Sequence, residues 1–142
     1  MNIFFSGSIS GGLEDAALYQ DLICLLKEHG KVFSEHTVGV DGKAHYDSED
    51  ITPSEAHDRD VDWVLNSDIV VAEVSTPSIG VGYEIGRAVA AGIFVIALYK
   101  IGATKPLSAM IAGAPSDCVV VLMYREIEEI RDKLKKVITK RI

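Results

Sequence analysis

Carboxylates are the side chains of this sequence with the clearest catalytic potential. Glu84 follows a segment rich in Gly and Ser, and we expect it in the first turn of a helix, where the helix dipole stabilises its anion as a nucleophile. Acidic residues also occur at helix starts without a catalytic role, so composition alone leaves both interpretations open. A second acidic group lies on the predicted helix 53–66 and comprises Glu55, Asp58, Asp60 and Asp62. Asp58 and Asp62 are i,i+4 neighbours on one face of this helix, whereas Asp60 points in another direction. At most one or two of these carboxylates can therefore line a pocket.

Two segments rich in Gly and Ser have the composition of phosphate-binding loops. Residues 6–12 follow the first apolar run, and residues 75–82 follow a later one and lead into a helix. Glycine lets backbone N–H groups approach an anion closely, hydroxyls add donors, and a helix N-terminus favours negative charge. Although Gly and Ser also form ordinary turns, two such loops at one sheet edge favour a phosphate site.

Several other kinds of active site lack support in the sequence. The first loop has no G-x-G-x-x-G order, and neither a P-loop motif nor a G-x-S-x-G elbow occurs in the chain. The His residues lack metal-ligand spacing, so we expect no catalytic metal. Cys24 and Cys118 lack C-x-x-C spacing and lie in apolar contexts, where we expect buried free thiols.

The charge balance and the distribution of apolar residues limit the partners and the location of the protein. With 14 Lys and Arg against 21 Asp and Glu, the formal net charge is -7, which disfavours binding of DNA or RNA polymers. No apolar run reaches the ~18 residues of a membrane span, and the first residues do not resemble a signal peptide. We therefore expect no membrane partner and a cytoplasmic protein, or a nuclear one in a eukaryote.

Strands and helices alternate along the chain and predict a single domain over residues 1–142. Apolar runs typical of buried strands occur at 3–5, 31–34, 69–74, 93–99 and 118–123. Thr52 to Glu55 is a capping box, which predicts the start of the helix 53–66. Further helices are expected at 18–26, 83–91, 107–111 and 126–142. Crossovers of this length predict a parallel sheet between layers of helices.

Five sequence motifs together resemble one enzyme family. They are G-S-I-x-G-G after the first strand, E-H after the second, H-x-x-D-x-x-W, the long segment V-V-A-E-V-x-x-P-S-x-G-V-G-Y-E-I-G-R-A, and L-S-A-M-I. In these motifs, from Ile3 to about Tyr124, the chain is similar to the 2'-deoxynucleoside 5'-monophosphate N-glycosidases of the nucleoside 2-deoxyribosyltransferase superfamily. The resemblance implies a flavodoxin-like five-stranded parallel sheet with helices on both faces. It also implies a homodimer that hydrolyses a nucleoside monophosphate to free base and sugar 5-phosphate, without a metal or organic cofactor.

The resemblance also implies roles for individual residues. Glu84 matches the glutamate that attacks the anomeric carbon, and Asp60 matches the carboxylate that protonates or positions the leaving base. An anion at an oxocarbenium-like centre and an acid at the leaving group are the requirements of a retaining glycosidase, whose two carboxyls lie roughly 5–5.5 Å apart. The residues that match the 5'-phosphate site are Gly7, Ser8, Ile9, Ser78 and Gly80.

Other matching residues concern the base and the neighbouring subunit. Ser108 matches a hydroxyl that reaches the phosphate from the partner, and Met110 matches an apolar contact near the base of the neighbouring site. His36 and Trp63 are candidates for shaping the base pocket, and a position in the core is an equal alternative for Trp63. Residues 37–51, a predicted surface loop, follow no pattern of the family.

One departure from the family pattern leaves the sugar specificity open. Phe4 stands where the family usually has Tyr, so one hydroxyl beside the sugar and the catalytic carboxylate is missing, as in related cytidine monophosphate hydrolases. Deoxyribonucleotides are therefore the first expectation and ribonucleotides the second. A nucleoside deoxyribosyltransferase and a non-catalytic nucleotide sensor are the remaining alternatives, and a sensor would need the phosphate site but not both Glu84 and Asp60.

Overall fold

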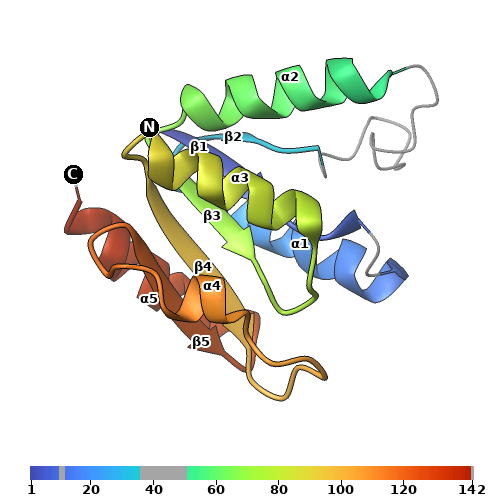
Figure 1. Ribbon diagram of the computed structural model, residues 1–142. Coiled ribbons are helices and arrows are strands. Elements are labelled where there is room, and N and C mark those ends of the chain that lie inside the picture. Colours follow the sequence, from blue (N-terminus) through green and yellow to red (C-terminus); the bar gives the residue numbers. More distant parts are fainter. Residues whose placement is uncertain (10–11, 36–50, 142) are drawn as a thin grey trace.

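Five parallel strands form the central sheet of the computed structural model, which describes residues 1–9, 12–35 and 51–141 (Figure 1). The strands are β1 (Asn2–Ser6), β2 (Lys31–Phe33), β3 (Ile69–Glu73), β4 (Phe94–Lys100) and β5 (Val119–Tyr124). They are arranged in the order β2-β1-β3-β4-β5, and every neighbouring pair is parallel. The strand order reverses between β1 and β3, and parallel sheets bind ligands beyond the carboxyl ends of the strands at such a point.

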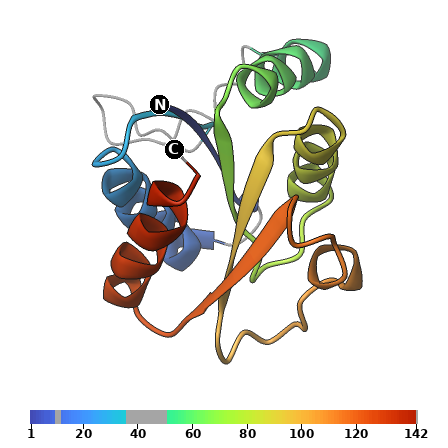
Figure 2. The ribbon, with the colours of Figure 1, turned by 90° about the vertical axis from the view of Figure 1, so that its left-hand side faces the viewer.

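Helices cover both faces of the sheet. They are α1 (Gly12–Leu26), α2 (Pro53–Leu65), α3 (Ile79–Ala90), α4 (Ala109–Ala112) and α5 (Ile127–Thr139). Figure 2 shows α1 and α5 on one side of the sheet and α2, α3 and α4 on the other. The predicted flavodoxin-like α/β architecture is therefore confirmed.

The two helical layers enclose separate hydrophobic cores, because successive strand side chains point to opposite faces. Phe5 belongs to the core under α1 and α5, together with Leu22 and Leu134, and Phe4 belongs to the core under α2 and α3, together with Val64. Both phenylalanines are completely buried. This double burial explains why the strands are nearly continuous apolar runs in the sequence.

The predicted start of α2 is confirmed, but the predicted start of α3 is wrong. The Glu55 N–H donates to Thr52 Oγ1 over 3.2 Å and the Thr52 N–H donates to Glu55 Oε2 over 2.8 Å, which is the expected capping box. Helix α3 begins at Ile79 rather than at residue 83, because Ser78 caps it by accepting a hydrogen bond from the Val81 N–H.

The cysteine prediction is confirmed in one respect and wrong in another. Cys24 and Cys118 are both free thiols, but Cys24 is exposed on α1 and Cys118 is half-buried before β5. The predicted surface loop 37–51 lies outside the described residues except for its last residue. Among the helices of the described part of the chain, none is long and apolar enough to cross a membrane.

Candidate active site

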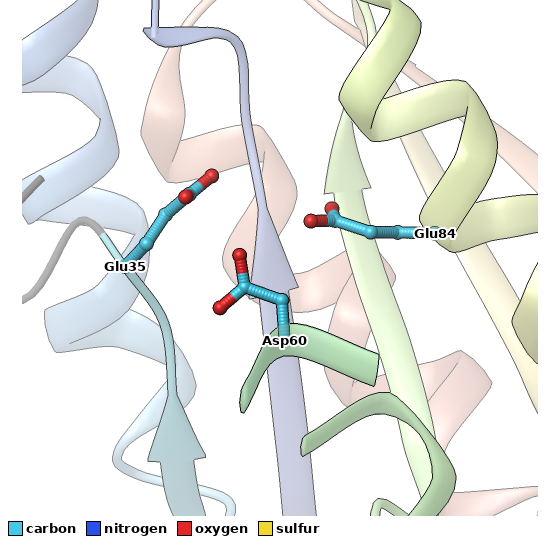
Figure 3. Close-up of side chains that lie close together, drawn as sticks. All are labelled: Glu35, Asp60 and Glu84. Atoms are coloured by element: carbon cyan, nitrogen blue, oxygen red, sulfur yellow. The ribbon is translucent and has the colours of Figure 1, made fainter. Parts of the chain in front are cut away.

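Three carboxylates from different elements converge beyond the carboxyl ends of β1 and β2. Glu35 follows β2, Asp60 lies on α2 and Glu84 lies on α3, and one oxygen of each lies within 4.8 Å of the other two. Figure 3 shows the three side chains directed toward one another. Asp60 and Glu84 are buried, with exposed fractions of 9% and 7%. Because acidic side chains are seldom buried together, this cluster is the strongest candidate for a reactive centre in the described residues.

Glu84 occupies the second turn of α3, not the first turn predicted from the sequence. It shares the inward face of the helix with Val81, Ile85 and Ala88, all of which pack against the sheet. Burial raises the pKa of the Glu84 carboxyl to about 7, and the negative charge of Asp60 contributes in the same direction. The expected stabilisation of its anion by the helix dipole depended on a first-turn position, and Glu84 lies beyond that turn.

Two groups oppose the rise in the pKa of Glu84. The Ser6 hydroxyl, at the end of β1, donates a hydrogen bond to Glu84 Oε2, and the positive charge of Arg59 acts in the same direction. Ser6 is 1% exposed, so this hydrogen bond is shielded from water. Together these groups make a carboxylate that can ionise near neutral pH although it is buried.

Of the two glutamates in the cluster, Glu35 has the more strongly raised pKa. Burial, followed by the negative charges of Asp60 and Glu84, raises the pKa of the Glu35 carboxyl to about 8, and a hydrogen bond with Asp60 adds to this effect. Arg59 opposes the rise from a distance of 3.9 Å between its Nη2 and Glu35 Oε2. Near neutral pH, Glu35 is thus suited to donate a proton.

Arg59 connects the acidic cluster to an aromatic group. Its Nε donates to Asp60 Oδ1 over 2.8 Å, and its guanidinium carbon lies 4.8 Å from the centre of the Trp63 ring. The Trp63 ring lies beside Phe4 and Phe33, with ring centres 6.4 Å and 6.2 Å apart. Trp63 therefore packs at the edge of the core under α2, as the alternative of a core position anticipated.

The residues expected at the phosphate site lie in the segments that follow two neighbouring strands, β1 and β3. Ser8 is buried and Ile9 is half-exposed in the segment after β1, while Ser78 and Gly80 lie at the start of α3, after β3. Gly7 is required for steric reasons, because a Cβ at this position would approach the Tyr19 ring to 2.9 Å. The fold thus brings both Gly/Ser segments to the same edge of the sheet.

Ser108 and Met110 lie apart from the carboxylates within one chain. They line a groove of about 900 Å³ between α3 and α4, and Ser78 and Ile79 line its other side. Ser108 caps the short helix α4 by accepting a hydrogen bond from the Met110 N–H. None of the three clustered carboxylates lines this groove.

Phe4 and His36 are the remaining residues that the sequence predicted at the substrate site. Phe4 is completely buried against Trp63, so its ring presents no exposed surface to a ligand in this conformation. His36 lies outside the described residues.

Sequence reasoning missed Glu35 and Arg59, and it placed Ser6 in the phosphate-binding segment 6–12 without its contact to Glu84. The E-H motif after the second strand includes Glu35, and it is the feature of the sequence that could have identified this residue. Carboxylates are also the ligands of hard divalent cations, but an acidic cluster by itself does not define a metal site.

The sheet and the cluster define a class of protein: a doubly wound α/β protein with a carboxylate site beside the reversal in strand order. The chain belongs to the nucleoside 2-deoxyribosyltransferase family, whose model matches residues 3–122.

Relatives of this chain are known at both the sequence and the structural level. A 5-hydroxymethyl-dUMP N-hydrolase from Danio rerio is 41% identical over 99% of this chain and 99% of its own length. A protein of the same name from Tetraodon nigroviridis is 43% identical over 92% of this chain and 94% of its own length. The structure of a CMP N-glycosidase from Clostridium botulinum has the same fold, with a TM-score of 0.70, 23% identity, and coverage of 94% of this chain and 97% of that one.

Proposed function

We propose that this protein hydrolyses the N-glycosidic bond of 2'-deoxynucleoside 5'-monophosphates to free base and deoxyribose 5-phosphate. The observation that carries the proposal is the buried cluster of Glu35, Asp60 and Glu84, in which two pKa values are raised toward neutrality. Relatives at 41% and 43% identity are named as N-hydrolases of a deoxynucleoside monophosphate, which supports the same reaction here.

In the first step, Glu84 acts as the nucleophile. One carboxylate oxygen attacks the anomeric carbon, the bond from this carbon to the base nitrogen breaks, and its electron pair leaves with the base. A proton from Glu35, which is hydrogen-bonded to Asp60, neutralises the departing base. Asp60 orients this proton. Asp60 itself is held by a charge-assisted hydrogen bond from Arg59.

In the second step, water releases the sugar from Glu84. The deprotonated pair of Glu35 and Asp60 accepts a proton from water as its oxygen attacks the anomeric carbon, and the ester bond to Glu84 breaks. The cluster oxygens lie within 4.8 Å of one another, which is close to the spacing of retaining glycosidases and below the ~6.5–9.5 Å of inverting enzymes. This spacing favours a covalent intermediate over direct attack by water.

The two strand exits supply the phosphate site in this proposal. The hydroxyls of Ser8 and Ser78 and the backbone N–H groups around Gly7, Ile9 and Gly80 can surround a monophosphate beside the start of α3. A site of this kind holds a single phosphate by neutral donors, which suits a protein with a formal net charge of -7. A 5'-phosphate would also fix the sugar relative to Glu84.

A homodimer completes the site in this proposal. The groove between α3 and α4 is mainly apolar, and Ile79 and Met110, which line it, are 96% and 83% exposed. Such surfaces are typical of protein interfaces. A second copy seated here would cover both side chains and bring its Ser108 and Met110 toward the neighbouring phosphate and base.

A ribonucleotide-preferring hydrolase is the second candidate, and Phe4 is the observation that favours it. Phe4 has no hydroxyl to occupy the space or the hydrogen bonds near the sugar 2-position, whereas a tyrosine would. Changing Phe4 to Tyr should therefore shift the preference toward the deoxy sugar. An unchanged ratio of the two activities would identify Phe4 as a packing residue, in keeping with its complete burial.

A panel of substrates tests the proposed function. The protein is incubated with deoxy- and ribonucleoside monophosphates and with unphosphorylated nucleosides, and free base is measured by chromatography. We expect base release from deoxynucleoside monophosphates without any acceptor base. No release from any monophosphate would refute hydrolysis and leave a nucleotide sensor, whereas release that requires a second base would indicate a deoxyribosyltransferase.

A further inference from the structure

Ser6 is a buried residue in the centre of the site, and the proposed reaction steps assign it no role. It ends β1, its exposed fraction is 1%, and its hydroxyl donates a hydrogen bond to Glu84 Oε2 on α3. The contact joins residues 78 positions apart in the sequence.

The fold fixes Ser6 in this position. Ser6 pairs with Ala72 of β3 at the carboxyl edge of the sheet, where β1 and β3 lie side by side. Because strand side chains alternate between faces, Ser6 and Phe4 point toward the layer of α2 and α3, where Glu84 lies. Phe4 carries no hydrogen-bond donor, so on this part of β1 Ser6 provides the hydroxyl that Glu84 can use.

We propose that Ser6 is a positioning residue for Glu84: its hydroxyl holds one carboxylate oxygen and leaves the other directed at the anomeric carbon. This inference rests on the proposed function, in which Glu84 is the nucleophile. A carboxylate on a flexible side chain must be fixed in one orientation to attack efficiently, and a hydrogen bond from a rigid strand provides such a constraint.

The charged groups around Glu84 give the Ser6 hydrogen bond a second effect. Asp60 on α2 and Glu35 after β2 place negative charge beside Glu84, and burial disfavours its anion further. Arg59 on α2 and the Ser6 hydroxyl stabilise the anion. Removing the hydroxyl leaves Arg59 as the remaining stabilising group among these, so a larger fraction of Glu84 should be protonated near neutral pH.

The variants Ser6→Ala and Ser6→Cys test the role of the hydroxyl, and Ser67→Ala is the matched control. Ser67 is also a buried serine whose hydroxyl donates a hydrogen bond, over 2.7 Å to the Trp63 carbonyl, but it follows α2 and lies outside the carboxylate cluster. Its replacement therefore has the general cost of a lost buried hydrogen bond without an effect on Glu84. Thermal unfolding confirms that each variant is folded.

The kinetic readout is the dependence of kcat and KM on pH with a hydrolysed monophosphate. For Ser6→Ala we expect kcat to fall about tenfold or more, since hydrogen bonds to charged groups are strong, with KM little changed. The acidic limb of the kcat profile should move to higher pH, and Ser6→Cys, a weaker donor, should lie between Ser6→Ala and the wild type. An unmoved acidic limb in Ser6→Ala, or an equal loss of kcat in Ser67→Ala, would overturn the proposal.

A measurement without substrate separates this inference from the proposed function. Carbon-13 NMR of labelled glutamate carboxyls follows the titration of Glu84 in the unliganded protein, and Glu84→Gln assigns the resonance. We expect the midpoint of Glu84 to rise in Ser6→Ala and to stay unchanged in Ser67→Ala. A rise without any hydrolysis would refute the proposed function and leave the Ser6 contact intact, whereas no rise would refute the inference itself.

Discussion

The Tyr124 hydroxyl at the end of β5 donates a hydrogen bond to Glu73 Oε1 at the end of β3, over 3.0 Å. Glu73 also accepts hydrogen bonds from the hydroxyl and the N–H of Ser75, and the Ser75 hydroxyl accepts one from the Lys100 N–H at the end of β4 over 2.7 Å. This buried network joins the ends of three strands. It holds the segment that leads to Ser78 and α3, on the face of the sheet opposite the carboxylate cluster.

Loss of the Tyr124 hydroxyl should destabilise the fold. In Tyr124→Phe, the buried Glu73 carboxyl loses one of its partners, and we expect the free energy of unfolding to fall by about 1–2 kcal/mol. The control is Tyr99→Phe, which removes a hydrogen bond from a half-buried tyrosine to the Lys105 carbonyl. Denaturant unfolding compares the variants. A loss in Tyr124→Phe no larger than that in Tyr99→Phe would argue against a structural role for the network.

The acidic cluster should make stability fall as the pH rises. The pKa values of Glu84 and Glu35 increase on folding from their ordinary value of 4.5 to about 7 and about 8. Between pH 4.5 and these raised values, the folded state binds more protons than the unfolded state. The stabilising contribution of the two glutamates is therefore fully present below pH 4.5 and is lost as the pH rises through about 7 and about 8.

Substitution of Glu35 tests this linkage. At pH 8, Glu35→Gln should increase the free energy of unfolding by about 1–2 kcal/mol, because folding suppresses the ionisation of Glu35, a cost that a neutral side chain does not have. The gain should shrink at pH 5, where Glu35 is already neutral. The control Glu28→Gln changes an exposed carboxylate that follows α1 and pairs with Arg131, away from the cluster. A gain that is the same at both pH values would contradict the raised pKa of Glu35.

Activity should have a bell-shaped dependence on pH. The proposed mechanism needs Glu84 ionised and Glu35 protonated, and their pKa values of about 7 and about 8 place the maximum of kcat/KM between these values. In Glu35→Gln, the basic limb should disappear and the remaining activity should be low. A basic limb that persists in this variant would assign the proton donor to another group, with Asp60 the next candidate.

Mixing two inactive variants tests whether neighbouring subunits share a site. Ser108→Asp places a negative charge where the partner's phosphate is expected, and Glu84→Gln removes the nucleophile. If Ser108 serves the neighbouring site, a mixed dimer has one site with both original residues, and an equal mixture should recover about a quarter of the wild-type activity. Activity equal to the sum of the two separate variants, in a mixture that has exchanged subunits, would contradict a shared site.

Local sequence patterns were sufficient to predict the architecture. Apolar runs identified all five strands, and the capping box of Thr52 and Glu55 located the start of α2. The start of α3 was misplaced because Ser78, its capping residue, lies within a Gly/Ser segment that resembles a loop. Such a cap is apparent only when the hydrogen bond to the Val81 N–H is known.

The site was harder to predict than the fold, because its chemistry depends on contacts between distant segments. Asp60 and Glu84 were expected in the site from their motifs. The rise in the pKa of Glu84, however, comes from burial and from the negative charge of Asp60, which lies on a different helix. Glu35 follows a strand of three residues and has no local feature that predicts its burial. Likewise, no spacing in the sequence relates Ser6 to Glu84.

In the proposed mechanism, Glu84 becomes covalently bound to the sugar. A 2'-fluorinated analogue of the preferred monophosphate should slow both steps, because fluorine destabilises an oxocarbenium-like transition state, and mass spectrometry of the digested protein then locates any adduct. We expect release of one base per site and a sugar 5-phosphate on the peptide that contains Glu84. Base release with no adduct, or with an adduct on Asp60 or Glu35 instead, would contradict the account.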